Sequence, residues 1–210
     1  MKPGHRNTRP QLDLGRRFRH FVRARLKASG PRWIVRRVWE KEFAEGGWDF
    51  LEDTEGDCVY PLVERYCRGG SILDLGCGSG NTGNELRWDA YATYIGVDLS
   101  DTAVGKAIQR TQQNGRSEKN QYLQGDICSY GPTGHFDVIL FRECIWNVPR
   151  SRLQEVLDRC RGHLAPSGVM IVRIYDRVKF KDLVRRLINS CELVEEYAPG
   201  DIKDIVLVLR

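Results

Sequence analysis

Residues 71–81 read SILDLGCGSGN, and this stretch decides the fold of the chain. A short apolar run that contains one acid, Asp74, is followed by glycines at alternate positions, Gly76, Gly78 and Gly80. This pattern predicts a buried strand that breaks into a tight turn. Glycine adopts positive φ without steric cost and, because it lacks a Cβ, lets the backbone approach a ligand closely. We therefore expect the strand end to form the floor of a ligand site, although a plain glycine turn would explain the same residues.

Asp74 indicates which ligand this floor suits. Residues 78–83 also match the G-x-G-x-x-G pattern of dinucleotide sites. A dinucleotide places its pyrophosphate at this turn, where a carboxylate two residues before the first glycine would repel it. S-adenosylmethionine has no phosphate and carries an ammonium group, which the same acid attracts. The acid therefore favours S-adenosylmethionine over a dinucleotide.

The order D-x-G-x-G-x-G, from Asp74 to Gly80, resembles the first motif of the class I S-adenosylmethionine-dependent methyltransferases. The resemblance implies an enzyme with S-adenosyl-L-methionine as its cofactor. It also implies a Rossmann-like α/β fold, in which a mostly parallel seven-stranded sheet closes with an antiparallel C-terminal hairpin. The alternation of apolar runs and helical stripes from Ser71 onward independently predicts a doubly wound sheet.

The composition excludes several other classes of protein. A chain of 210 residues fits one α/β domain with a short appendage. The seven cysteines are odd in number and lack C-x-x-C or His-rich spacing, so we expect neither a disulfide framework nor a metal site. No apolar run reaches 18 residues, and the N-terminus lacks the apolar core of a signal peptide. We therefore expect a soluble, cytoplasmic protein.

The net charge of +5 divides unevenly along the chain. Residues 1–39 contain twelve Lys or Arg and one acid, so residues 40–210 are acidic overall. We expect the basic character to belong to an N-terminal arm alone, residues 1–30. Apolar residues recur at helical spacing among the cations between Arg16 and Lys27, which predicts a short basic amphipathic helix. This helix could pack on its own domain, bind anionic lipid at the inner membrane surface, or bind RNA, with lipid favoured over RNA.

Residues 31–70 form a helical segment that leads into the methyltransferase domain, which we place at residues 71–210. A helix is predicted to begin near Arg32 and to end at Gly46 and Gly47. Residues 39–49, WEKEFAEGGWD, are similar to segments that fold over the cofactor as a lid in many methyltransferases with this core. The alternative is that these aromatic residues cover the edge of the sheet.

Acids at the ends of later strands extend the expected cofactor site. A predicted strand at residues 94–99 ends in Asp98, whose carboxylate can accept hydrogen bonds from both ribose hydroxyls. A helix predicted at residues 81–88 turns its N-terminal amides toward the ligand, a favourable place for a carboxylate. In the family that the chain resembles, an acid after the third strand reaches the adenine amine and the next apolar residue packs on the ring. The cofactor site is thus expected to include Asp74, Gly76, Cys77, Gly78, Asn81, Asp98, Leu99, Asp126, Ile127 and Arg142.

The rest of the chain continues the same alternation. Ser100 is expected to cap a helix whose sheet-facing residues include Ile108. Pro149 is expected to open another helix, which Pro166 and Gly168 close. Further strands are predicted at residues 121–127, 135–143, 169–175, 192–197 and 204–209.

Methyl transfer from a sulfonium is an in-line displacement, so orientation and exclusion of water can accelerate it without a protein acid or base. A hydroxyl acceptor would still benefit from a general base. Because ligands bind at the carboxyl ends of parallel strands, Glu143, Tyr175 and Asp176 are the candidates for this base. His135 and His163 precede their strands and lie at the wrong end.

The segment after the fourth strand bears on the methyl acceptor. Residues 142–149 lack the Asn/Asp-Pro-Pro-Tyr signature of enzymes that methylate base or glutamine amines. They look more like the small-molecule enzymes, which often carry a His pair where this chain has Trp146 and Asn147. We expect a small-molecule acceptor with an oxygen or nitrogen nucleophile. The alternatives are an RNA methyltransferase whose basic arm grips phosphates, and a cofactor-binding interaction module without catalysis.

Overall fold

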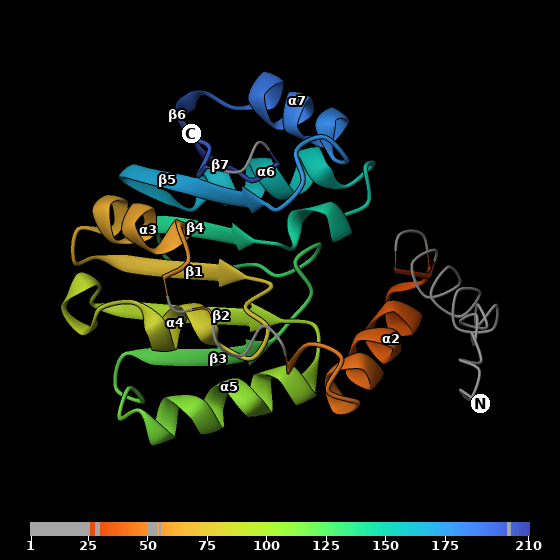
Figure 1. The fold of residues 1–210 in the computed structure, drawn as a ribbon, viewed down its shortest axis with the longest axis vertical. Helices are drawn as coiled ribbons and strands as arrows, with labels where there is room; N and C mark the ends of the chain where they lie inside the picture. The colour runs from red at the N-terminus through yellow and green to blue at the C-terminus, as the bar shows by residue number, and fades with distance from the viewer. Residues whose placement is uncertain (1–25, 28–29, 50–53, 55, 201–202) are drawn as a thin grey trace, which may run out of the picture.

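A central sheet organises the computed structural model, which describes residues 26–27, 30–49, 54, 56–200 and 203–210. The sheet has seven strands in the order β3-β2-β1-β4-β5-β7-β6 (Figure 1). The first five of these run parallel, whereas β7 pairs antiparallel with both β5 and β6. The doubly wound, mostly parallel sheet with an antiparallel C-terminal hairpin is thereby confirmed. Its strands are Ser71–Leu75 (β1), Thr93–Asp98 (β2), Asn120–Gln124 (β3), Phe136–Arg142 (β4), Leu164–Ile174 (β5), Leu193–Tyr197 (β6) and Ile205–Leu209 (β7).

Helices cover both faces of the sheet. Alternate residues of β1 and β4 belong to two different apolar clusters, one shared with α3 and α5 and the other shared with α6 and α7. This double burial explains why β4 is an almost continuous apolar run. The helices are Arg32–Ala44 (α2), Val59–Cys67 (α3), Asn81–Glu85 (α4), Asp101–Gln113 (α5), Leu153–Gly162 (α6) and Lys181–Ser190 (α7), with 3-10 turns at Trp88–Ala90 (η2) and Ile145–Asn147 (η3).

Several details of the predicted elements were wrong, among them the start of α6, which begins at Leu153 and not at Pro149. Ile108 does not join the buried face of α5, because this residue is 39% exposed. Pro166 and Gly168 do not end α6, which stops at Gly162; they lie inside β5, which begins at Leu164. The pairing of β5 with β4 is irregular at this point, and such an irregularity accommodates a residue without an N–H.

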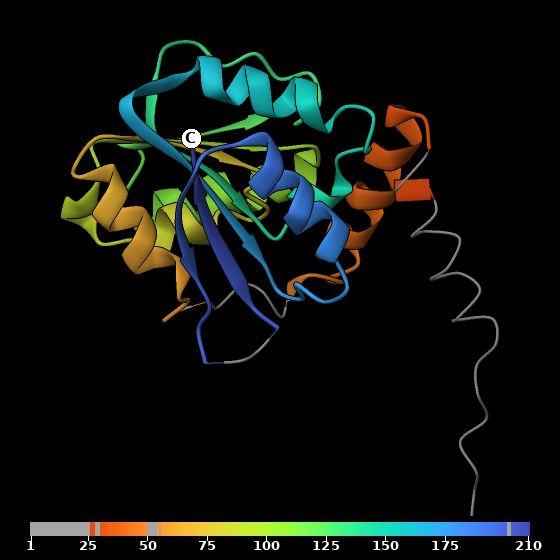
Figure 2. The same cartoon turned by 90° about the horizontal axis from the view of Figure 1, so that it is seen from above.

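Helix α2 lies beside the carboxyl ends of the parallel strands (Figures 1 and 2). Polar contacts fasten it there. Glu40 accepts hydrogen bonds from the backbone N–H and the hydroxyl of Thr102 in the first turn of α5, at 3.2 and 2.7 Å, and Arg36 pairs with Asp101. Of the residues of α2, Val35 and Phe43 are the buried ones. The helix is therefore attached to the domain by charge more than by a large apolar face.

The N-terminal arm was expected to end at residue 30, but its last described part packs on α2. The Lys27 ammonium lies 3.5 Å from the centroid of the Trp39 ring and 2.5 Å from the Glu42 carboxylate. Leu26 and Lys27 are helical. The remainder of the basic helix predicted at residues 16–27 lies outside the described residues.

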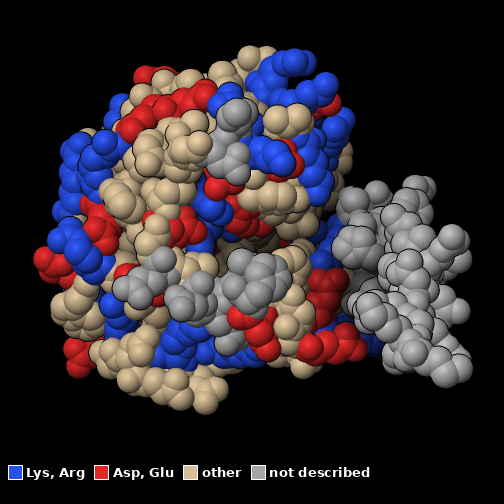
Figure 3. All heavy atoms as spheres, viewed as in Figure 1, with Lys and Arg blue, Asp and Glu red and all other residues tan. Residues whose placement is uncertain are grey.

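Basic side chains are not confined to the arm. Lys and Arg also gather over α7, at the top of the face shown in Figure 3. Helix α7 contributes Lys181, Arg185 and Arg186 against a single acid, Asp182. The expectation that the basic character belongs to the arm alone was therefore too narrow.

The described part of the chain contains no helix that is long and apolar enough to cross a membrane. It also contains no group of three or more His, Cys, Asp or Glu side chains arranged to hold a metal ion. All seven cysteines lie in described residues and are free thiols, and five of them are buried.

Candidate functional site

A cavity of about 530 Å³ opens at the carboxyl ends of the parallel strands. Ten of the thirteen residues predicted to form the site line it. They are Gly76, Cys77, Gly78, Asn81, Asp98, Leu99, Ile127, Arg142, Glu143 and Tyr175. The other three, Asp74, Asp126 and Asp176, do not reach the cavity wall. The sequence therefore predicted most of the residues that meet at this cavity, and their roles toward a cofactor stay predictions.

The glycine turn shapes the floor of the cavity. Gly76, Gly78 and Gly80 all have positive φ, between 56° and 81°. A Cβ on Gly76 would lie 2.7 Å from the Cβ of Cys144, so a side chain cannot fit there. A Cβ on Gly78 would meet no described atom nearer than Phe43, at 3.8 Å. The missing side chain of Gly78 therefore leaves open space in the floor, which a cofactor can fill.

Asp98 stands at the end of β2 and lines the cavity beside Leu99. Its Oδ2 accepts a hydrogen bond of 3.0 Å from Gly78 N–H, and its Oδ1 accepts one of 2.9 Å from Ser100 N–H. Burial raises its pKa to about 6, against these backbone N–H groups, which lower it. Each oxygen keeps acceptor capacity for a further donor. Asp98 thus fits the predicted role as acceptor for two ribose hydroxyls.

Asp74 lies beneath the floor. Its side chain is 1% exposed, and the Tyr94 hydroxyl donates a 2.5 Å hydrogen bond to Oδ2. Oδ1 is buried without a hydrogen-bond partner among the described atoms. Burial raises the pKa of Asp74 to about 6, although the Tyr94 hydrogen bond and the Arg142 charge lower it. Attraction of the cofactor's ammonium by this carboxylate stays a prediction, and it would act from behind the cavity wall.

Asp126 is held by a residue that the sequence did not single out. Arg32, at the start of α2, donates to both carboxylate oxygens, from Nε to Oδ2 at 2.5 Å and from NH2 to Oδ1 at 2.6 Å. Burial works to raise the pKa of Asp126, but these bonds and the N–H of Cys128 bring it below its ordinary value. Arg32 itself lines the cavity, together with Ile127.

Asn81 lines the cavity at the start of α4, which has five residues where eight were expected. Ser79 donates to its Oδ1 at 3.1 Å. The attraction of this helix terminus for a carboxylate is therefore weaker than predicted, because so short a helix aligns few peptide dipoles. Asn81, the first residue of α4, is the part of this helix that borders the cavity.

Glu143 follows β4 with φ at 57°, a conformation that a residue with a Cβ rarely adopts. Arg173 NH1 lies 2.5 Å from its Oε1, and Tyr175 N–H donates to its Oε2 at 3.2 Å. Burial raises the pKa of Glu143 to about 7, against the Arg173 charge, which lowers it. Unusual backbone geometry and a perturbed pKa in a cavity wall are both features of functional residues.

The other two candidates for a general base differ in position. Tyr175 lines the cavity and is 42% exposed. Asp176 instead accepts hydrogen bonds from the N–H groups of Val178 and Lys179, at 3.1 and 2.8 Å, ahead of α7. Its carboxylate thus stabilises a turn outside the cavity.

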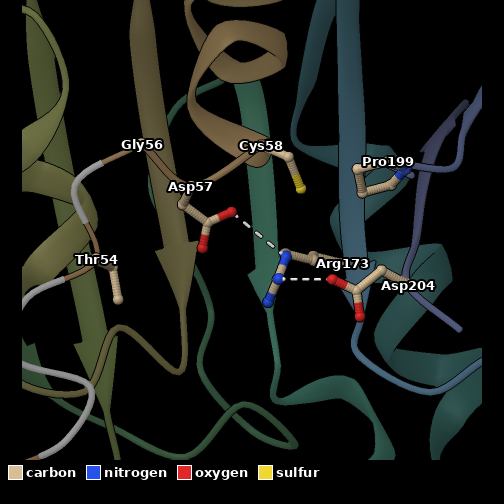
Figure 4. A pocket seen from close by; sticks show the side chains of 7 residues that line it. All are labelled: Thr54, Gly56, Asp57, Cys58, Arg173, Pro199 and Asp204. Carbon is tan, nitrogen blue, oxygen red and sulfur yellow. Dashed lines mark hydrogen bonds and ion pairs between the residues drawn. The ribbon is translucent and has the colours of Figure 1, made fainter. Parts of the chain in front are cut away.

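A charged network behind Glu143 was not predicted. Figure 4 shows Arg173 between Asp57 and Asp204, in a second hollow of about 340 Å³. Arg173 contacts these acids at 3.4 and 3.1 Å, and Arg142 also pairs with Asp57, at 2.5 Å. Arg173 lines both hollows and so connects this network to Glu143. The signal available in the sequence was a single arginine in the apolar run of β5.

Aromatic side chains form two walls of the cavity. On the α2 side stand Trp39, Phe43 and Trp48, with ring centroids 5.4 to 6.4 Å apart. The second wall comes from later in the chain. The centroid of the Trp146 ring lies 5.3 Å from that of Tyr175, edge to face, and 4.8 Å from that of Phe180, on which Trp146 stacks. Because Trp39, Phe43 and Trp48 line the cavity, residues 39–49 fit a lid over the cofactor better than a segment that only covers the edge of the sheet.

Known proteins resemble this chain in sequence. Residues 72–168 match a family described as a methyltransferase domain. The N-terminal Xaa-Pro-Lys N-methyltransferase 1-B of Xenopus laevis is 25% identical over 169 residues, which cover 70% of this chain and 75% of that protein.

Solved structures resemble the whole fold. The N-methyltransferase NodS of Bradyrhizobium japonicum WM9, in complex with S-adenosyl-L-homocysteine, aligns with a TM-score of 0.65 and 16% identity, over 83% of this chain and 96% of that one. The glycopeptide N-methyltransferase MtfA, complexed with sinefungin, aligns with a TM-score of 0.63 and 12% identity, over 75% and 87% of the two chains. At these identities the likeness concerns the fold.

Proposed function

We propose, because this chain belongs to the class I S-adenosylmethionine-dependent methyltransferases, that it methylates an amine nitrogen of a small molecule. The cofactor is S-adenosylmethionine, which supplies an electrophilic methyl group on a sulfonium. One observation carries the proposal: Glu143 lines the same cavity as Trp146 and Tyr175, and the Tyr175 N–H donates to its carboxylate at 3.2 Å.

Glu143 is suited to take the proton that an amine must lose. An amine attacks only through a free lone pair, so an ammonium acceptor first gives up a proton. A carboxylate with a pKa of about 7 is partly ionised at neutral pH and accepts a proton more readily than an ordinary glutamate. Arg173, 2.5 Å away, keeps its carboxylate oriented. The ammonium proton would pass to an Oε atom of Glu143, and the freed lone pair of the nitrogen would bond to the methyl carbon as the methyl–sulfur bond breaks, with the electron pair of that bond staying on the sulfur of the demethylated cofactor.

The aromatic wall supports an amine over a hydroxyl. A cation is attracted to the face of Trp or Tyr, and the attraction strengthens where water is excluded. Trp146 is fixed by stacking on Phe180, so its ring is already in place before the acceptor arrives. A rigid aromatic surface next to a carboxylate therefore recognises an ammonium group and then removes its proton.

The size of the cavity supports a compact acceptor. Its volume of about 530 Å³ falls in the range of small-molecule sites, roughly 300 to 1,000 Å³, and the cofactor must occupy part of it. The amine at a peptide N-terminus is a second candidate. It is favoured by the Xenopus laevis relative, which is named for N-terminal Xaa-Pro-Lys sequences. An RNA acceptor and a role without catalysis are the remaining alternatives.

The test uses labelled S-adenosylmethionine with a cell extract divided by size into small molecules, peptides and RNA. Half of each fraction is first acetylated and then treated with hydroxylamine, which releases oxygen esters and leaves amines blocked. Label that enters the small-molecule fraction and disappears on acetylation is the expected result. Label that resists acetylation, or that ribonuclease removes, would refute the amine proposal. Transfer of label into peptides alone would select the second candidate.

A further inference from the structure

The wall of the cavity near Asp126 presents a guanidinium and not a carboxylate. Arg32 lines the cavity, whereas Asp126 lies behind it. The two side chains form a bidentate pair, with Nε 2.5 Å from Oδ2 and NH2 2.6 Å from Oδ1. The Arg32 side chain is 36% exposed and the Asp126 side chain 14%, so the arginine is the more accessible partner.

Most acceptor sites of Asp126 are occupied, whereas most donors of Arg32 are not used by Asp126. A carboxylate has about four acceptor sites, and those of Asp126 receive two donors from Arg32 and a third from Cys128 N–H at 2.8 Å. A guanidinium has about five N–H donors, of which Asp126 takes two. The surface that faces a ligand here is therefore rich in donors. The planar face of the guanidinium also offers a stacking surface for a ring.

We propose that Arg32 contacts the nucleobase of the cofactor, and that Asp126 positions Arg32 instead of accepting the hydrogen bond of the base's amine. The family resemblance implies the reverse, with Asp126 as the direct partner of the amine. Two apolar residues that line the same cavity, Leu99 and Ile127, offer surfaces on which a flat ring can pack. The proposal rests on the cofactor and does not depend on the acceptor proposed above.

A donor surface changes which base the site prefers. The ring nitrogens of adenine accept hydrogen bonds from Arg32, but its exocyclic amine is a donor and gains nothing from a guanidinium. A 6-oxo base places an acceptor at the same position. The site should therefore discriminate weakly between the 6-amino and the 6-oxo base, whereas a free Asp126 would reject the 6-oxo base.

Calorimetry on the full chain tests this with two probes, S-adenosyl-L-homocysteine and its 6-oxo counterpart, S-inosyl-L-homocysteine. Wild type should bind the two with dissociation constants within about threefold of each other. Arg32→Gln should weaken both by about tenfold or more, the usual effect of losing hydrogen bonds to a charged group. Arg36→Gln is the matched control, because Arg36 lies on the same helix and pairs with Asp101 outside the cavity.

Two results would overturn the proposal. One is a 6-oxo ligand that binds wild type at least tenfold more weakly, together with an Arg32→Gln variant that keeps its affinity for the adenosyl ligand; Asp126 would then contact the amine. The other is an equal loss in Arg32→Gln and Arg36→Gln, which would mean that α2 docking alone matters. The assay contains no methyl acceptor, so a failure of the amine proposal leaves its outcome unchanged. Arg32→Lys keeps the charge without the planar fork and should restore little of the affinity.

Discussion

Gly78 N–H donates a 3.0 Å hydrogen bond to Asp98 Oδ2, which ties the glycine turn after β1 to the end of β2. The two residues are twenty positions apart in the sequence. They meet because β1 and β2 are parallel neighbours, with Leu75 opposite Val97. The same carboxylate thus shapes the floor of the cavity and borders the space that a ribose would occupy.

Asp98→Ala should weaken binding of S-adenosyl-L-homocysteine by tenfold or more. Two hydrogen bonds from ribose hydroxyls to a charged acceptor contribute about 1.5 to 3 kcal/mol each. Because Asp98 also holds Gly78 and Ser100, Asp98→Asn is the companion variant, which keeps one acceptor oxygen. Calorimetry on both variants measures the effect. An unchanged dissociation constant in Asp98→Ala would remove Asp98 from the site.

Asp74→Asn should stabilise the protein without ligand at neutral pH. The folded pKa of Asp74, about 6, lies above its ordinary 3.8. The folded state therefore binds this proton more tightly, and the stability gained is present at low pH and lost as the pH rises through about 6. Asparagine avoids that loss and still accepts the Tyr94 hydroxyl. At 1.36 kcal/mol per pKa unit, we expect a gain of about 1 to 3 kcal/mol at about pH 7.5 and little difference near pH 4.

Urea unfolding of wild type and Asp74→Asn at both pH values provides the measurement. A stability difference that is the same at the two pH values would show that ionisation of Asp74 is not its source. The same variant should bind S-adenosyl-L-homocysteine more weakly, if the buried charge attracts the ammonium of the ligand. Unchanged affinity would leave Asp74 with a purely structural role.

Glu143→Gln should alter the pH dependence of methyl transfer. A proton acceptor with a pKa of about 7 is active when ionised, so kcat/KM should rise as the pH increases through about 7. The acceptor amine titrates too, but its contribution is common to both proteins. We expect Glu143→Gln to lose this limb and to lower kcat by about 10² to 10⁴, the usual effect of general base catalysis. A profile that keeps its limb near pH 7 in the variant would exclude Glu143 as the base.

Lys27→Ala should loosen the aromatic wall on α2. The Lys27 ammonium contacts the ring of Trp39 and the carboxylate of Glu42, and Glu42 also accepts from the Trp48 indole at 3.1 Å. A partly buried cation–π contact is worth about 0.5 to 2 kcal/mol, so cofactor binding should weaken by roughly twofold to thirtyfold if the whole contact energy is lost from the binding site. Lys41→Ala is the control. Lys41 is an exposed lysine on α2, and it pairs with Glu45 at 3.6 Å. Equal effects in the two variants would argue for a general charge effect.

The sequence predicted the sheet and most of the residues that line the cavity, because both depend on local patterns. Glycines at alternate positions after an apolar strand favour a tight turn. Asp98 ends β2 and Glu143 follows β4, and the carboxyl ends of parallel strands share one edge of the sheet. These rules predict where a residue lies in the fold from its place in the sequence, and they do not require the tertiary packing to be known. They placed Glu143 and Tyr175 in the cavity wall, and they failed for Asp176 because a turn can use a carboxylate as readily as a site can.

Tertiary structure alone decided the partners of these acids. Arg32 lies 94 residues from Asp126, and Arg173 lies 30 residues from Glu143, so no local pattern relates the members of either pair. Each pairing follows from how α2 docks and from which strands are neighbours. The sequence by itself therefore determined the fold and the cofactor, and it pointed to the edge of the sheet where the cavity opens. Whether a carboxylate there is free to bind a ligand or already holds an arginine depends on long-range packing, because charge and burial at a point in space are set by every element that reaches it.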